Sequence, residues 1–519
     1  MVTGEGVSRL GRVAAPTIVR VALARGAGAR SFSVRILQSE QPSFRRRILA
    51  PFLPFRPIIP MHATPVTTPQ AASVHPTTGD GDGLPRKLGV WSAAAAAVGL
   101  TIGSGIFRVP ATVAAESGSV GAIALVWVLG GVITLCGALT IAELAAAFPR
   151  AGGIYVYLRE AYGPLPAFLF GWSWFFIRSA ASAGTALVFV AYLGSFVPLG
   201  DAGQRAAAVA LIVLVGAANY RSVRLGAAIQ DASTVAKVLA ILLAAAAIFA
   251  LGQAGGGALA GPVGFAPAGL GGIGVALVAA LFAYDGWIAA TLIAGEVRDP
   301  GRALPRALAW GSVVIVATYL TINLAYLYAL PLAELAASKA VAVDAVTRVA
   351  GAGGAALIAA LVMLSTFGGL NAGLMTGPRV YYAMAEDGLF FRRVAAVHPR
   401  FGTPHVAVVL LVVLTALNAS VRTFEQLAEA FVLLLYPFLA LTVAAVFVLR
   451  RRRPELARPY RTVGYPLVPA VFLVGTVAMM VNSLLERPDA TLLAAGIVAV
   501  GVPIYYAWRS ASKRQPANS

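Results

Sequence analysis

Three charged residues lie inside long apolar segments of this chain, and one of them, Arg178 in the segment 164–197, is expected to be structural. Lys237 lies within the segment 231–251, and Asp285 lies within the segment 272–294. A charge inside a bilayer is costly, so acids and bases at that depth are candidate functional residues. We expect Lys237 to act as a tether between helices or as a proton carrier. Asp285 could orient a substrate ammonium, carry a proton or cap a broken helix.

A Gly-Ser-Gly sequence interrupts the first apolar segment, 89–115, at Gly103, Ser104 and Gly105. Glycines make a helix easy to unwind, and irregular backbone inside a membrane is tolerated only where it lines a cavity. The sixth segment repeats the interruption around Asp285. Breaks in the first and sixth segments are typical of two inverted five-helix repeats and point to a substrate site. The alternative is close helix packing by small residues.

The polarity of such a pair of breaks suits a zwitterion. Free N–H groups near Ser104 and Gly105 would present the positive end of a helix dipole to a carboxylate. Carbonyls near Ile102 and Ala283 would accept hydrogen bonds from an ammonium. We therefore expect an amino acid to fit between the two breaks.

The composition requires a membrane around these elements. The 519 residues are 59% hydrophobic and only 12% charged, and their mean hydropathy is +0.81. Soluble domains are about a quarter charged. The net charge of +19 is spread over short loops without a basic face interleaved with aromatics, so nucleic acid is not an expected partner. The expected surrounding is the lipid bilayer.

Apolar runs long enough to cross a bilayer predict an all-α polytopic protein with about 12 transmembrane helices. In this arrangement helices 1 and 6 are broken, and two extra helices follow the two repeats. The predicted segments are 89–115, 120–147, 164–197, 205–220, 231–251, 272–294, 307–330, 353–383, 405–420, 427–450, 463–485 and 490–508.

The distribution of positive charge predicts the orientation. Loops on the side of residue 86 carry 22 Lys and Arg, against 6 on the opposite side. By the positive-inside rule, both ends of the membrane domain are predicted to be cytoplasmic, in a cell (inner) membrane.

Residues 1–85 form a separate basic region without a spanning segment. Three interpretations are open: an organellar presequence in the first 50 or so residues, a disordered tail, or a true translation start at Met61. The last is favoured, because few Lys and many Arg, Ala and Gly indicate a GC-rich gene. The predicted permease domain covers 86–510, and 511–519 is a cytoplasmic tail.

Other classes of site lack support in the sequence. No nucleophile elbow, zinc-protease motif, P-loop or dinucleotide-binding motif is present, so an enzyme, including a membrane-embedded one, is not expected. His398 and His405 have no Cys or Glu cluster beside them, so no metal or other cofactor is expected. Cys136 is the single cysteine, which excludes an internal disulfide.

The sequence resembles the amino acid-polyamine-organocation superfamily, and within it the L-type amino acid transporters. The resemblance covers residues 86 to about 485. It rests on the order and spacing of 103–107 (GSGIF), 142–144 (AEL) with 148–153 (FPRAGG), 165–168 (LPAF), 282–284 (FAY) with 286–287 (GW), 296–300 (EVRDP), Asn371, and 452–456 (RRPEL) with 458–460 (RPY).

The resemblance implies a secondary active amino acid transporter that works by alternating access, as an exchanger or coupled to protons. A permease for polyamines or other organocations is the alternative. The resemblance also implies roles for individual residues. Residues 103–105 match the substrate backbone site, Phe282 an aromatic gate, Asn371 a side-chain contact, and Lys237 a lysine that replaces a sodium site. With Ile102, Ala283, Tyr284 and Asp285, these form the predicted substrate site.

Two positions depart from the family pattern. Members often have Gly at the position of Asp285 and an amide at that of Ile288, so substrate selectivity and coupling stay open. Animal members join a glycoprotein through a cysteine after the third span. Residues 198–205 contain none, so no disulfide-linked accessory subunit is expected.

Overall fold

The computed structural model describes residues 89–514 with gaps at 151, 222, 253–256, 261–268, 293, 392, 395, 397 and 402, together with two earlier strands. The chain divides into two compact units, 1–79 and 80–519. In the first unit, β1 (Thr17–Val21) pairs antiparallel with β2 (Phe32–Ile36). The predicted start at Met61 lies outside the described residues.

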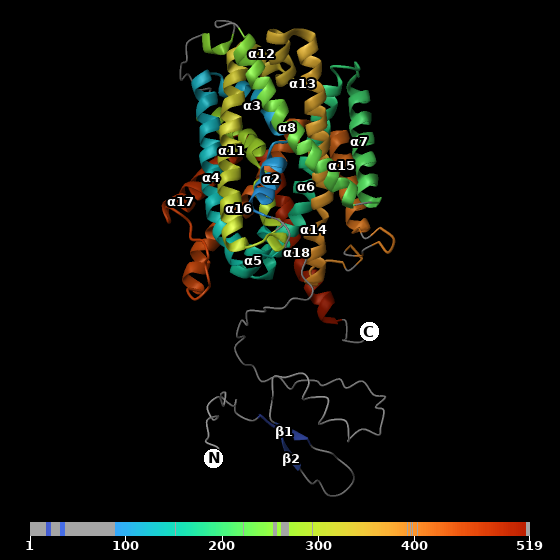
Figure 1. Cartoon of the computed structure of the whole chain (residues 1–519), viewed down its shortest axis with the longest axis vertical. Coiled ribbons are helices and arrows are strands. Elements are labelled where there is room, and N and C mark those ends of the chain that lie inside the picture. Colours follow the sequence, from blue (N-terminus) through green and yellow to red (C-terminus); the bar gives the residue numbers. More distant parts are fainter. Residues whose placement is uncertain are drawn as a thin grey trace, which may run out of the picture. The chain divides into compact units, whose positions relative to one another are not determined.

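The second unit is a bundle of α-helices (Figure 1). Its helices are α2 (Val90–Thr101), α3 (Gly105–Ser117), α4 (Val120–Ala147), α5 (Ile154–Tyr162), α6 (Pro164–Leu193), α7 (Asp201–Arg221), α8 (Val223–Leu251), α9 (Gly269–Tyr284), α10 (Ala289–Leu292), α11 (Pro300–Ala329), α12 (Leu332–Ala337), α13 (Val341–Thr376), α14 (Pro378–Glu386), α15 (His405–Val421), α16 (Phe424–Arg452), α17 (Leu467–Glu486) and α18 (Pro488–Arg514). Two 3-10 turns, η1 (Ala258–Ala260) and η2 (Ala294–Glu296), lie between them.

Length and composition identify the membrane-crossing helices. Within the described residues, eight helices are long and apolar enough to cross a bilayer, and the bent pair α2 and α3 makes a further candidate. Shorter apolar helices cover Lys237–Leu251, Gly269–Tyr284 and His405–Val421. All the predicted spans therefore coincide with apolar helices, and the prediction of an all-α polytopic membrane protein is confirmed.

The order of elements repeats along the chain. A broken helix, a long helix, a short helix and another long helix occur first as α2/α3, α4, α5 and α6. They recur as α9/α10, α11, α12 and α13. The short helices α5 and α12 lie at opposite ends of the bundle (Figure 1). This is the order that two inverted repeats require.

The predicted boundaries of the eighth span need correction. The sequence predicts one segment over 353–383, but α13 begins at Val341 and α14 is a separate helix. Gly351 interrupts α13 with a φ of +66°. Asp344 and Arg348 lie in the part of α13 before this glycine, so the apolar signal starts only after it.

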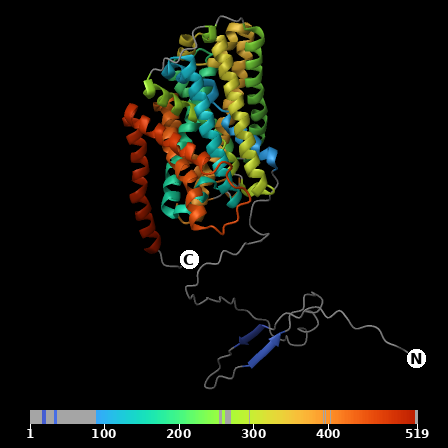
Figure 2. The same cartoon turned by 90° about the vertical axis from the view of Figure 1, so that its left-hand side faces the viewer.

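Capping residues and apolar surfaces account for the rest of the frame. Ser119 accepts a hydrogen bond from the N–H of Ala122 at the start of α4, and Thr423 and Gln426 form a capping box at the start of α16. Large apolar side chains are exposed on the outer helices, including Leu214 and Leu485. The last helix, α18, lies at the periphery of the bundle (Figure 2). Such an apolar exterior suits contact with lipid.

Candidate functional site

The first helix breaks where the sequence predicts it. After Thr101 the N–H of Gly103 turns back to the carbonyl of Thr101, so it no longer donates to the carbonyl of Gly99. Helix α3 then restarts at Gly105, at an angle of 47° to α2. The break therefore frees the carbonyl of Gly99 and exposes the N–H groups at the start of α3.

The second break lies between α9 and α10 and crosses the first in close contact. Gly286 has a φ of +120°, and a Cβ built there would lie 2.5 Å from the backbone nitrogen of Thr101. A Cβ built on Gly105 would lie 2.6 Å from the Cα of Ala283. Both glycines are required, since a side chain at either position would push the two breaks apart.

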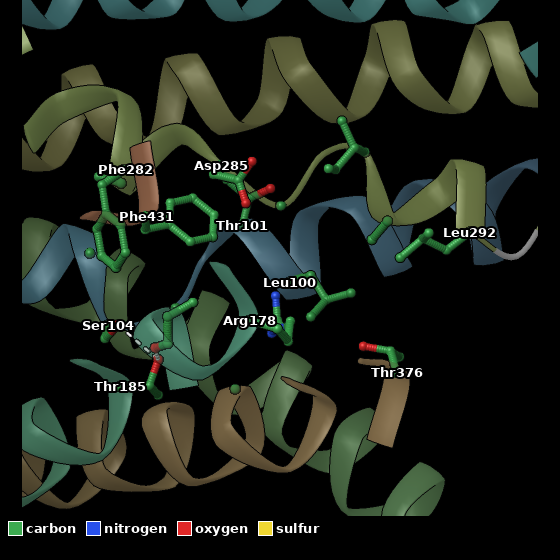
Figure 3. Close-up of a pocket in the computed structure, with 18 of the residues that line it drawn as sticks. Leu100, Thr101, Ser104, Arg178, Thr185, Phe282, Asp285, Leu292, Thr376 and Phe431 are labelled. Carbon is green, nitrogen blue, oxygen red and sulfur yellow. Dashed lines mark hydrogen bonds between the residues drawn. The ribbon is translucent and has the colours of Figure 1, made fainter. Parts of the chain in front are cut away.

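A cavity lies at this crossing, and six of the predicted site residues line it. The hydroxyl of Ser104 lies 3.1 Å from that of Thr185 on α6. Figure 3 shows these side chains at the cavity with Phe282, Asp285, Arg178 and Thr376. The lining residues predicted from the sequence are Gly103, Ser104, Gly105, Phe282, Ala283 and Asp285.

The remaining predicted residues lie near the cavity without lining it. Ile102 is buried and its N–H donates to the carbonyl of Val98. Tyr284 is buried, and its hydroxyl donates to the carbonyl of Trp127 on α4. Asn371 accepts a hydrogen bond from the side-chain amide of Asn219 on α7. A substrate contact by any of the three stays a prediction.

Lys237 reaches the first break from α8. Its side chain is fully buried, and its ammonium donates a hydrogen bond to the carbonyl of Gly99. That carbonyl is the one that loses its helical donor at the break. Lys237 therefore supplies both a positive charge and the missing hydrogen bond.

Tyr319 on α11 joins the two breaks, although the sequence gives no sign of it. Its hydroxyl lies 2.8 Å from the carbonyl of Thr101 and 3.0 Å from that of Ala283. A hydroxyl has one proton, so it donates to one of these carbonyls at a time. The carbonyl of Ala283, which is predicted to accept from a substrate ammonium, keeps a second lone pair for that purpose.

The polar side of the cavity carries one acid and one base. Asp285 lines it with an Oδ1 that has no hydrogen-bond partner among the described residues, while the N–H of Gly286 donates to the same carboxylate. Arg178 on α6 also lines the cavity, is close enough to attract Asp285, and leaves its Nε without a partner in the described structure. Each of the two side chains therefore has an atom free to form a hydrogen bond with a ligand.

An aromatic cluster closes one end of the cavity. Phe282 packs edge to face against Phe424 and Phe431 of α16, with ring centroids 5.5 and 5.3 Å apart. Beyond it, Arg108 on α3 pairs with Glu425 and donates to the carbonyl of Ser338 at 2.8 Å. This end thus has an apolar layer followed by an ionic layer.

Comparison with known proteins identifies the family. The model of the amino acid permease family matches residues 88–507. The chain belongs to the amino acid permeases. The prediction of an amino acid-polyamine-organocation superfamily member that is not an enzyme is thereby confirmed.

Three relatives place this permease among amino acid transporters. The serine/threonine exchanger SteT of Bacillus subtilis (strain 168) is 32% identical over 82% of this chain and 97% of its own length. The large neutral amino acids transporter small subunit 2 of Mus musculus is 32% identical, over 85% of this chain and 84% of that protein. The Asc-type amino acid transporter 1 of Mus musculus is 33% identical over 83% of each chain.

Proposed function

We propose that this permease exchanges small polar amino acids across the membrane by alternating access. The observation that carries the proposal is the crossing of two helix breaks at a cavity lined by backbone of both. The N–H groups that begin α3 would bind the substrate carboxylate, and carbonyls of both breaks would accept from its ammonium. No cofactor is required for such binding.

The cavity wall favours a polar side chain on the substrate. A large apolar side chain would cover Arg178 and Asp285 without offering either a hydrogen bond, and buried unpaired charges are costly. A hydroxyl or amide can donate to the carboxylate and accept from the guanidinium. The relative described as a serine/threonine exchanger supports the same substrate class and supports exchange.

The closed aromatic end supports alternating access. Phe282 separates the cavity from the ionic layer of Arg108 and Glu425, so a substrate would have to leave toward the opposite end. By the distribution of Lys and Arg, the closed end is predicted to be extracellular. A swing of Phe282 with α9 would then open the site to the outside.

Counterflow in proteoliposomes tests the proposal. Vesicles loaded with each of the twenty amino acids, and with putrescine for the organocation alternative, would be given the same labelled compound outside at trace level. We expect L-serine and L-threonine to give the strongest counterflow, at a rate that does not depend on a pH gradient. Counterflow of putrescine alone would favour the organocation permease, and uptake driven only by a pH gradient would replace exchange with proton coupling.

A further inference from the structure

A second cavity lies beyond the aromatic cluster, outside the site described above. Its volume is about 210 Å³, compared with about 70 Å³ for the first cavity. Helices α3, α9, α16 and α17 line it. Because the volume per water in the liquid is about 30 Å³, the space is large enough for a small solute.

The second cavity continues the path of the first. Val275, Val278 and Ala279 line it and share one face of α9 with Phe282, which follows them at helical spacing. On α16, Phe424 lines the second cavity and packs on Phe282. Phe282 therefore acts as a lid between two cavities, both of which lie along α9 and α16.

The charges of the second cavity are incompletely compensated. Glu116 on α3 pairs with Arg487 at 3.2 Å, and Glu425 pairs with Arg108. Glu429, one turn after Glu425, lines the cavity and makes no hydrogen bond or ion pair within the described part of the chain. These three acids face two bases, so the set carries one net negative charge that a positively charged group would balance.

Buried hydrogen-bonding capacity lies beside these charges. Ser483 on α17 lines the cavity, is only 2% exposed, and its hydroxyl has no partner among the described residues. Arg487, one turn further, uses a single guanidinium nitrogen on Glu116, and its charge also acts on Glu429. A hydroxyl, a carboxylate and a guanidinium with spare donors thus converge on one space.

We propose that this cavity is a second amino acid site, which binds the incoming zwitterion before the lid opens. The ammonium donates hydrogen bonds to Glu429 and to the hydroxyl oxygen of Ser483. The free N–H groups of Arg487 donate to the substrate carboxylate. The apolar stripe of α9 faces the side chain. This assignment rests on the proposed function, amino acid transport.

The test measures the KM for labelled L-serine separately from each side, in intact cells and in inside-out vesicles. Glu429→Gln removes the charge at nearly constant volume. We expect its external KM to rise about tenfold, as loss of one charge-assisted hydrogen bond predicts, with an unchanged internal KM. Glu429→Asp, which keeps the charge, should stay close to the unmodified protein on both sides.

The matched control is Glu334→Gln on α12, which removes an acid at the same end of the bundle but outside the cavity. Its external KM should not change, which separates binding from long-range attraction of the substrate. An unchanged external KM for Glu429→Gln, or equal rises on both sides, would overturn the second site while leaving transport intact. Absence of serine uptake by the unmodified protein would instead overturn the proposed function, and the second site with it.

Discussion

The two helix breaks use the same glycine device but differ in how the protein holds them. At the first break, Lys237 binds the freed carbonyl of Gly99, while Tyr319 is shared between the carbonyl of Thr101 and that of Ala283 at the second break. At the second, the side chain of Asp285 faces the cavity with an oxygen that has no hydrogen-bond partner in the described structure. The first break is therefore held by the side chain of Lys237, whereas the second break leaves a carboxylate oxygen of Asp285 free to bind the substrate.

Under the proposed function, this difference separates two tasks. The fixed start of α3 can bind the carboxylate that all amino acids share, and backbone carbonyls of both breaks can bind their common ammonium. A second break with a free acid, opposed by Arg178, can select among side chains. Substitutions at the first break should therefore affect all substrates alike, and substitutions at Asp285 should change their ranking.

The largest expected effect comes from the crossing point itself. Gly286→Ala places a methyl group 2.5 Å from the nitrogen of Thr101, in a conformation that costs other residues about 1–3 kcal/mol. We expect transport of every amino acid to be lost, as measured by counterflow. Gly353→Ala is the control, because a Cβ there meets nothing within 4 Å. Normal counterflow by the Gly286 variant would show that the two breaks need not touch.

Lys237→Ala should have the next largest effect. It leaves the buried carbonyl of Gly99 without a donor, at a cost of about 1–3 kcal/mol. We expect most activity to be lost for all substrates while the protein still folds, which thermal unfolding in detergent would check.

Because of the charge on Lys237, we expect amino acid uptake not to depend on sodium. Two like charges about 4 Å apart repel by about 4 kcal/mol at an effective dielectric near 20, so Na⁺ should not bind beside the ammonium. Uptake should be equal in choline and sodium buffers. Strong stimulation by sodium would contradict the proposed position of Lys237 in the mechanism.

Phe282→Ala should have an intermediate effect, because it removes one of the three rings in the aromatic cluster between the two cavities. Turnover should fall more than stability, and Phe282→Trp should keep some transport. Turnover numbers from counterflow would be compared with melting temperatures for both variants. Full turnover by the Ala variant would exclude a lid function.

The smallest expected change in rate, and the most selective, belongs to Asp285→Asn. An amide keeps the size but loses the charge that balances Arg178, so substrates should change rank more than they change in total rate. Uptake of each amino acid would be measured from pH 5 to 8, with Asp489→Asn as an exposed control. An unchanged ranking and pH profile would leave Asp285 only the role of a helix cap.

Local signals in the sequence were enough to predict the breaks. Gly103, Gly105 and Gly286 stand inside apolar runs, and a membrane tolerates an irregular backbone there only beside a cavity or within packed protein. The same kind of signal predicted the apolar spans, since length and hydropathy are properties of a single segment. The start of α13 was missed because Asp344 and Arg348 lower the hydropathy of its first ten residues.

Side-chain direction could not be predicted in the same way. Tyr319 is one of three tyrosines in the long apolar helix α11, and only the packing of α11 against both breaks makes it a bridge. Arg178 was expected to be structural because no neighbouring motif indicates the cavity, yet it lines the cavity. Conversely, Tyr284 is adjacent to Asp285 in sequence but turns toward Trp127, because successive residues of a helix face different directions.

The recognition of a free zwitterion by the crossed breaks is the central claim, and competition with blocked substrates tests it most directly. Counterflow of labelled L-serine would be measured with excess L-serine, L-serine methyl ester or N-acetyl-L-serine outside. The ester removes the carboxylate that the start of α3 would bind, and acetylation removes the ammonium that the carbonyls would bind. We predict inhibition by L-serine alone. Inhibition of equal strength by either blocked compound would show that the backbone of the breaks does not bind the substrate in this way.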